Sequence, residues 1–320
     1  MPTVPLNSDE LAARSQRALE AAAAAGRELG LTVEHPAIVH DAFSVVVHLA
    51  PSPVVVRAPV VLPDGFELPT QAARQSRELA IVAWLADRKQ PVVRPSPLVP
   101  RRPVQRAGFS MTFWEWVEVD PTREPDYDAR GPLVASLHAS LRDYPAPLPF
   151  LLPLSMSVSN GLDFLEHHPE LLAATDLDRA KREWQLLAPV FTSRGSFSQS
   201  FPGITTQALH GDSPGYNMIH TKSALVHADF EDVTLGPVEW DLTLQPPSAV
   251  DAYDQAAMRA GLRRVDHELL QIMNVLRLLQ VVAAHALIPK LPSLATDLAT
   301  PLEIWRQLPF AGGFKSKMEA

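Results

Sequence analysis

Apolar residues recur at helical spacing near the N-terminus and then give way to short β-branched runs. The stretch Ser8–Leu29 is rich in Ala, Leu, Arg and Glu, which predicts a helix capped by its first serine. Two Val-rich runs follow, Ser44–Ala50 and Pro53–Ala58, and the Pro-Ser-Pro turn between them is typical of a β-hairpin. A helix is expected over Thr70–Arg88 and a strand over Phe109–Val119.

Beyond residue 120 the periodicity is mostly helical. The pattern predicts helices over 127–142, 162–168, 177–191 and most of 248–308, a break over 192–206, and short β-like runs over 217–220 and 224–228. The fold class is therefore expected to be α+β. We expect a small N-terminal lobe over residues 1–117, with a leading helix, an antiparallel sheet and one further helix. A larger, mostly helical lobe is expected over 118–320.

Composition narrows the function classes. The net charge of -8 argues against sequence-independent nucleic-acid binding, and the absence of cysteine excludes disulfides, thiolate metal sites and Cys nucleophiles. The N-terminus does not resemble a secretory signal. A membrane span needs about 18 consecutive apolar residues. The closest run, Ile272–Ile288, is interrupted by Asn274, Arg277, Gln280 and His285. We expect a cytoplasmic enzyme that binds neither membrane nor nucleic acid.

The strongest chemical signal is the segment HGDSPGYN at residues 210–217. Asp212 precedes Asn217 by five residues, and Asp229 follows in the segment ADFE. Phosphoryl transfer needs one carboxylate to accept a hydroxyl proton and further oxygen ligands to hold Mg²⁺ against the phosphates. Each residue taken singly could instead be an ordinary turn residue. Their order and spacing together favour catalysis.

These segments resemble a known family. HGDSPGYN is similar to the HGDxxxxN motif of the aminoglycoside-phosphotransferase and choline-kinase-like enzymes, which are relatives of the protein kinases. ADFE resembles the metal-binding segment of the same enzymes, and PVEWDL resembles the Asp-Leu segment that follows it. The resemblance covers roughly residues 34–308 and implies a protein-kinase-like fold of two lobes.

The resemblance implies a role for each polar residue of these segments. Asp212 would be the catalytic base or would orient the hydroxyl, and His210 would brace its loop. Asn217 and Asp229 would bind Mg²⁺. Asp241 would support the loop through hydrogen bonds. The side chain of Glu231, which replaces the glycine of a protein-kinase DFG segment, is expected to face solvent; the alternative is contact with the metal.

The resemblance also places a nucleotide site in the small lobe. Arg57 stands where kinases carry a phosphate-binding lysine, and Glu78 on the next helix is its natural partner. The alternative is a surface arginine and a solvated glutamate. The turn before Ser44 contains no glycine, although the Ser44 hydroxyl could reach a phosphate. The inter-lobe hinge is expected at Trp114, Glu115 and Trp116; the alternative for the tryptophans is core packing.

The sequence therefore predicts a kinase that uses Mg²⁺ and either ATP or GTP. The leading expectation for the acceptor is a hydroxyl of an antibiotic or related natural product, such as an aminoglycoside, nucleoside or macrolide, whose modification would confer resistance. A metabolic kinase for an amino sugar or a choline-like alcohol is the alternative, and a non-catalytic pseudokinase is a third. The sequence leaves monomer and homodimer both open.

Overall fold

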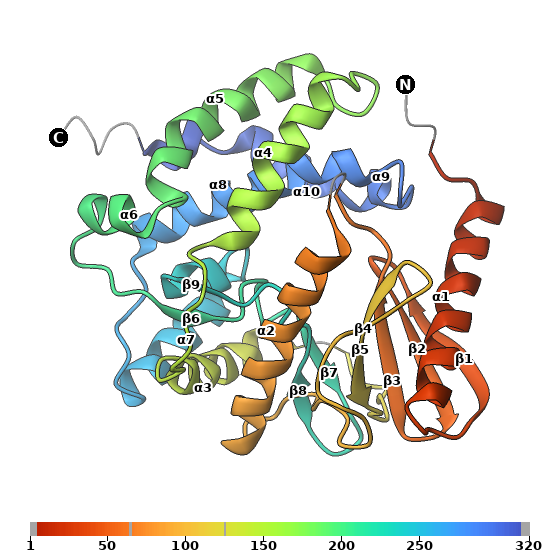
Figure 1. The fold of residues 1–320 in the computed structure, drawn as a ribbon. Coiled ribbons are helices and arrows are strands. Elements are labelled where there is room, and N and C mark those ends of the chain that lie inside the picture. The colour runs from red at the N-terminus through yellow and green to blue at the C-terminus, as the bar shows by residue number, and fades with distance from the viewer. Residues whose placement is uncertain (1–4, 64–65, 125, 315–320) are drawn as a thin grey trace. The chain divides into compact units, whose positions relative to one another are not determined.

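A computed structural model describes residues 5–63, 66–124 and 126–314 (Figure 1). The chain forms two compact units that are interleaved in sequence. The first comprises Met1–Arg123, Ile219–Glu231 and Pro289–Pro292, and the second comprises Glu124–Met218, Asp232–Ile288 and Ser293–Ala320. The first unit thus takes two short segments from late in the chain. The expected lobes, residues 1–117 and 118–320, stay a prediction.

The first unit is built on a five-stranded antiparallel sheet with the order β1-β2-β3-β5-β4. Its strands and helices are α1 (Ser8–Glu28), β1 (Val33–Asp41), β2 (Ser44–Pro51), β3 (Val54–Pro59), α2 (Leu68–Asp87), β4 (Val104–Arg106) and β5 (Phe109–Glu115). A separate two-stranded sheet pairs β7 (Met218–His220) with β8 (Leu225–His227).

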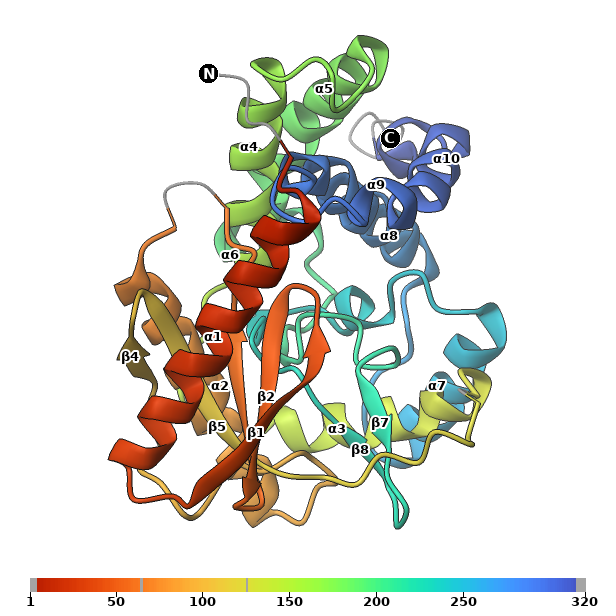
Figure 2. The ribbon, with the colours of Figure 1, turned by 90° about the vertical axis from the view of Figure 1, so that its right-hand side faces the viewer.

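Helix α1 covers one face of the five-stranded sheet (Figure 2). Small side chains on α1 pack against alternate valines of β2 and β3, and the packing is tight enough that a Cβ on Gly26 would lie 2.6 Å from the Leu49 side chain. Side chains alternate between the two faces of a strand. Because Val56 and Ala58 belong to this core, Arg57 between them points to the face that α1 does not cover.

The second unit is mainly helical, with a small antiparallel sheet formed by β6 and β9. Its elements are η1 (Asp128–Arg130), α3 (Gly131–Leu141), α4 (Leu152–Glu166), α5 (Ala174–Phe191), α6 (Arg194–Ser200), β6 (Gln207–Leu209), β9 (Thr234–Gly236), η2 (Val238–Leu242), α7 (Pro247–Arg259), α8 (His267–Ala283), η3 (Ala284–Leu287), α9 (Leu294–Asp297), α10 (Ala299–Gln307) and η4 (Phe310–Gly313).

Helix α8 lies in the core of the second unit, where it packs against α4, α5 and α10. By length and composition alone, the helical stretch His267–Leu287 could cross a membrane, but 67% of its most apolar window is buried inside the protein. That burial is typical of a core helix. The polar residues that interrupt its sequence therefore lie in a largely apolar environment.

The α+β class, with a β-rich N-terminal part and a helical C-terminal part, is confirmed. Several local predictions were wrong. The cap of α1 is Asn7, in a capping box with Glu10, and not Ser8. Strand β1 has no counterpart in the prediction, because this edge strand leaves most of its side chains exposed and lacks an apolar alternation. The expected break at 192–206 contains α6, a single short helix capped by Ser193.

Candidate functional site

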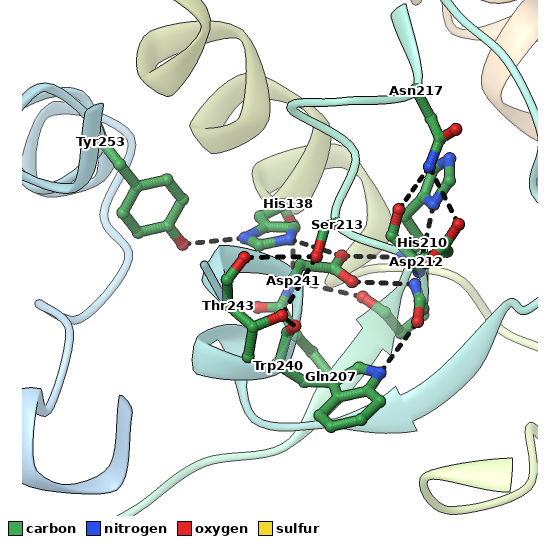
Figure 3. Close-up of polar contacts among 12 residues, drawn as sticks. His138, Gln207, His210, Asp212, Ser213, Asn217, Trp240, Asp241, Thr243 and Tyr253 are labelled. Atoms are coloured by element: carbon green, nitrogen blue, oxygen red, sulfur yellow. Dashed lines mark hydrogen bonds and ion pairs between the residues drawn. The ribbon is translucent and has the colours of Figure 1, made fainter. Parts of the chain in front are cut away.

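The segment His210–Asn217 leaves strand β6 as a tight loop in the second unit (Figure 3). Gly211 has φ of +93°, and a Cβ at this position would lie 1.9 Å from the carbonyl oxygen of Asp232. Only glycine tolerates that approach. Asp212 follows directly, so the glycine fixes the direction in which the chain presents the aspartate.

Asp212 and Asn217 are brought together by this loop. The Asn217 amide nitrogen donates to Asp212 Oδ2 at 3.1 Å and also to the Asp212 carbonyl oxygen. The Asp212 side chain remains 47% exposed. Both hydrogen bonds use the Asn217 nitrogen, so its amide oxygen is the atom suited to a cation. The carboxylate is thus oriented by the protein and still accessible to a second molecule.

Asp241 holds the backbone of the loop from beneath (Figure 3). Its carboxylate is completely buried and accepts hydrogen bonds from the backbone N–H groups of His210 and Gly211, each at 2.8 Å. His138 Nε2 lies 2.9 Å from the same carboxylate, and His138 Nδ1 lies 2.8 Å from the Tyr253 hydroxyl. Burial alone would raise the pKa of Asp241, but these hydrogen bonds and the nearby histidines lower it.

His210 is also completely buried. Its Nδ1 accepts a long hydrogen bond, 3.4 Å, from the backbone N–H of Asp212. A buried imidazole in this position stiffens the turn and makes no contact with solvent. The geometry suits the bracing role that the resemblance implies for His210.

Sequence reasoning gave no role to Arg277, which reaches the same loop from α8. Its Nη1 lies 3.3 Å from Asp212 Oδ1, on the other oxygen from the one that Asn217 contacts. The signal in the sequence was the charged residue inside an apolar helical run, which we interpreted only as an argument against a membrane span.

In the first unit, Arg57 lies among three carboxylates. Its Nη2 is 2.8 Å from Asp229 Oδ1, its Nη1 is 3.7 Å from Glu78 Oε1, and Nη1 also pairs with Glu231. The Arg57 side chain is 16% exposed. Burial alone would lower the pKa of Arg57, but the three carboxylates raise it. The expected partners Arg57 and Glu78 are together, although Glu78 is the most distant of the three acids.

The expectation that Glu231 faces solvent was wrong. Its side chain is 12% exposed and also pairs with Arg74, whose Nη1 lies 2.8 Å from Glu231 Oε1. Arg74, a residue of α2, was not among the predicted site residues. Because Glu231 and Asp229 already neutralise Arg57, burial and these two acids raise the pKa of Glu78 to about 8. We therefore regard Glu78 as a protonated neighbour of Arg57 at neutral pH.

The residues of the predicted hinge are held by the protein itself. The indole of the buried Trp114 donates to Thr112 Oγ1, the Glu115 N–H donates to Arg94 O at 2.8 Å, and the Trp116 N–H donates to Pro53 O at 3.0 Å. The Trp116 ring also stacks on His48 with centroids 4.0 Å apart. These two N–H groups are engaged, and a hinge contact with a purine stays a prediction.

Ser44 is the first residue of β2 and is buried next to the turn that carries no glycine. Its carbonyl oxygen accepts a hydrogen bond from Ala42 N at 3.3 Å across that turn. The turn is also anchored to α1, because the Asp41 carboxylate accepts a hydrogen bond from Ser15. Contact between the Ser44 hydroxyl and a phosphate stays a prediction.

The two predicted magnesium ligands belong to different units, Asn217 to the second and Asp229 to the first. Their convergence stays a prediction. Within residues 5–63, 66–124 and 126–314, no group of three His, Asp or Glu side chains is arranged to hold a metal ion alone. Magnesium in kinases is held by one or two protein ligands together with substrate phosphates and water. The amide oxygen of Asn217 and the carboxylate of Asp229 fit that requirement.

Comparison with known proteins identifies the fold of this chain. Neither the protein-family models nor the curated proteins contain a match. Among solved structures, a choline/ethanolamine kinase family protein from Mesorhizobium loti is 16% identical, with 97% of this chain and 99% of that chain covered and a TM-score of 0.57. Choline kinase LicA from Streptococcus pneumoniae is 13% identical, with 88% and 97% covered and a TM-score of 0.58.

The GDP complex of an aminoglycoside 2'-phosphotransferase-IIIa is 12% identical, with 88% of this chain and 95% of that chain covered and a TM-score of 0.56. At such identities the likeness shows the fold. This fold is the one shared by the protein-kinase-like group of small-molecule kinases, as the resemblance of the sequence motifs predicted. The substrate of any one of these proteins does not carry over to this chain by the likeness alone.

Proposed function

We propose that this chain is a small-molecule kinase that transfers the γ-phosphoryl group of ATP or GTP to a hydroxyl of a small acceptor. The observation that carries the proposal is the pairing of Asp212 with Asn217 on an accessible loop whose backbone the buried Asp241 holds. The fold supports the proposal, because the similar solved structures are named as kinases or phosphotransferases.

In the proposed reaction Asp212 orients the acceptor hydroxyl toward the γ-phosphorus. A bond forms between the acceptor oxygen and the γ-phosphorus, and the bond from the γ-phosphorus to the β–γ bridging oxygen breaks. The hydroxyl proton passes to the Asp212 carboxylate, and the nucleoside diphosphate leaves with the bridging oxygen. The accessible carboxylate and its fixed orientation suit this role.

Asn217, through its amide oxygen, and Asp229, through its carboxylate, would hold Mg²⁺. When bound, the ion would offset the charge of the β- and γ-phosphates. Arg57 already holds Asp229 in place at 2.8 Å, so its first role would be to position a metal ligand. Any contact of Arg57 with the phosphates would add to that role.

For the acceptor, we propose an antibiotic or related natural product, such as an aminoglycoside, nucleoside or macrolide, with resistance as the biological outcome. A metabolic kinase for a choline-like alcohol or amino sugar is the alternative. The names of the similar structures include both kinds of acceptor, a choline kinase and an aminoglycoside phosphotransferase. A nucleotide donor would place either reaction in the cytoplasm.

A pseudokinase is favoured by the turn before Ser44, which contains no glycine, and by Arg57, whose three acidic neighbours could exclude phosphate. The test of the proposal is release of ADP and GDP across a panel of antibiotics, nucleosides, amino sugars and alcohols. We expect acceptor-dependent release with at least one class. If no acceptor stimulates release and Mg-nucleotide does not bind, the pseudokinase replaces the proposal.

A further inference from the structure

Helix α8 carries a line of polar residues through an apolar core. Asn274, Arg277 and Gln280 follow one another at intervals of three, a spacing that places them on neighbouring turns of one side of the helix. The intervening residues, such as Leu276 and Leu278, are fully buried. Arg277 is buried, whereas Asn274 and Gln280 are partly buried. A buried polar residue costs free energy unless it is hydrogen-bonded, so Arg277 above all needs partners.

The two ends of the line anchor neighbouring segments. Asn274 Oδ1 accepts a hydrogen bond at 2.8 Å from the backbone N–H of Leu244, which follows η2. Gln280 Nε2 donates at 3.0 Å to Ser157 Oγ on α4. These contacts fix α8 against the chain on both sides of Arg277.

Arg277 at the centre holds the loop of residues 210–217 and its support. Its Nη2 donates to Gly211 O at 3.1 Å, its Nε donates to Thr243 Oγ1 at 3.1 Å, and its Nη1 lies 3.3 Å from Asp212 Oδ1. The guanidinium also stacks on Trp240, 3.9 Å from the ring centroid. Arginine suits the position because its planar group has five donors in a fixed arrangement and can stack on a ring.

The two oxygens of Asp212 are therefore held by different donors. Arg277 contacts Oδ1, and Asn217 donates to Oδ2. Arg277 is itself held by its surroundings, because its side chain is 10% exposed and also donates to Gln280 Oε1 at 3.0 Å. A carboxylate fixed at both oxygens keeps one orientation while remaining partly open to solvent.

We propose that Arg277 is a positioning residue that sets the orientation of the Asp212 carboxylate toward the acceptor hydroxyl. This inference rests on the proposed function, in which Asp212 receives the hydroxyl proton. A misplacement of about 1 Å in a reacting group can cost on the order of a hundredfold in rate. Loss of Arg277 therefore lowers kcat and leaves nucleotide binding, which involves other residues, unchanged.

The test measures kcat and both KM values for Arg277→Met and Arg277→Lys, each corrected for the folded fraction. We expect Arg277→Met to lower kcat by about tenfold to a hundredfold with an unchanged nucleotide KM. Lysine keeps the charge but is a single point donor that cannot serve Gly211, Thr243 and Asp212 together, so it recovers part of the loss. A wild-type kcat in either variant overturns the inference.

Arg179→Met is the matched control. Arg179 stacks on Trp305 at 4.5 Å, pairs with Glu183 and donates to two carbonyl oxygens near the C-terminus, which are contacts of the same kinds. Its loss lowers stability and leaves the kcat of the folded protein unchanged. An equal fall in kcat for Arg179→Met and Arg277→Met would show that Arg277 has only a structural role, and this would overturn the inference.

A double-mutant cycle, which compares the free energies of unfolding of the wild type, the two single variants and the double variant, separates this inference from the proposed function. We expect Asp212→Ala and Arg277→Met to be non-additive in their effect on stability, because each removes the partner of the other. Additive effects overturn the inference whatever the activity. A wild-type protein that transfers phosphate to no acceptor overturns the proposed function, while coupling in the cycle still supports the contact through which Arg277 would act.

Discussion

Arg57 has more acidic partners than a phosphate-binding residue needs. Asp229 and Glu231 are its near partners, Glu78 is a third acid at 3.7 Å, and Glu231 is shared with Arg74. One buried guanidinium cannot stabilise three ionised carboxylates equally, so the most buried acid keeps its proton. The cluster organises Asp229, and any phosphate would have to compete with Glu231.

Replacing Asp229 with alanine tests the metal role of this residue. We expect Asp229→Ala to abolish the Mg²⁺ dependence of nucleotide binding in calorimetry, because the substitution removes a carboxylate ligand. Asp143→Ala is the control, since that carboxylate is 71% exposed and belongs to no site described above. Unchanged Mg²⁺ dependence in Asp229→Ala would contradict the assignment.

The protonation of Glu78 predicts a pH effect on stability. Its pKa is about 8 in the folded chain and 4.5 in the reference state, so the folded state binds the proton more tightly. The contribution of Glu78 to stability is present in full below pH 4.5 and is lost as the pH rises toward 8. Glutamine does not titrate, and urea unfolding of Glu78→Gln should lack this part of the decline. Identical pH profiles for the two proteins would show that Glu78 has an ordinary pKa.

At the scale of elements, the loop between β6 and β7 is held from several sides. Asp241 in η2 accepts from the backbone of His210 and Gly211, and Arg277 in α8 donates to Gly211 O and contacts Asp212. The loop has little regular secondary structure, but its backbone makes several buried hydrogen bonds. It is held by η2, α3 and α8 in addition to the hydrogen bonds that His210 and Asn217 make within the loop.

Replacing Asp241 with asparagine should weaken the attachment of this loop to η2. The amide cannot accept from His210 N, Gly211 N and His138 at once, and one buried donor loses its partner. We expect a loss of about 3 kcal/mol in the free energy of unfolding, because a buried donor is left without its charged acceptor. Asp254→Asn is the control, because Asp254 Oδ1 accepts a hydrogen bond from the Val265 N–H at 2.8 Å and asparagine keeps that acceptor. Equal losses in both variants would refute the account.

At the scale of the whole molecule, sequence pattern predicted the fold class and the main elements. The Val-rich runs, the long helices and the HGDSPGYN segment are local signals, and the structure contains β2, β3, α1, α2 and α5 close to where the pattern placed them. Boundaries were less well predicted. The expected strand to Val119 ends at Glu115, and the expected helical region 248–308 is divided among α7, α8 and shorter helices.

Contacts between residues far apart in sequence were beyond prediction wherever the family resemblance did not name both partners, as it did for Asp241 and its loop. Arg57 and Glu231 are 174 positions apart, and neither lies in a pattern whose period would reveal the other. Arg277 likewise reaches Gly211 across 66 positions. The motif identified which residues carry chemistry. Their buried partners depend on tertiary packing, which leaves no local trace beyond a charged residue in an apolar run.

The most direct test of the central claim compares wild type with Asp212→Asn in phosphoryl transfer. Each protein is incubated with Mg-ATP or Mg-GTP and the acceptor panel, and the phosphorylated acceptor is detected by mass spectrometry. We predict that wild type phosphorylates at least one acceptor, and that Asp212→Asn folds with the same circular dichroism but loses turnover by orders of magnitude. Near-normal turnover in Asp212→Asn, or no phosphorylated acceptor with wild type, would contradict the account.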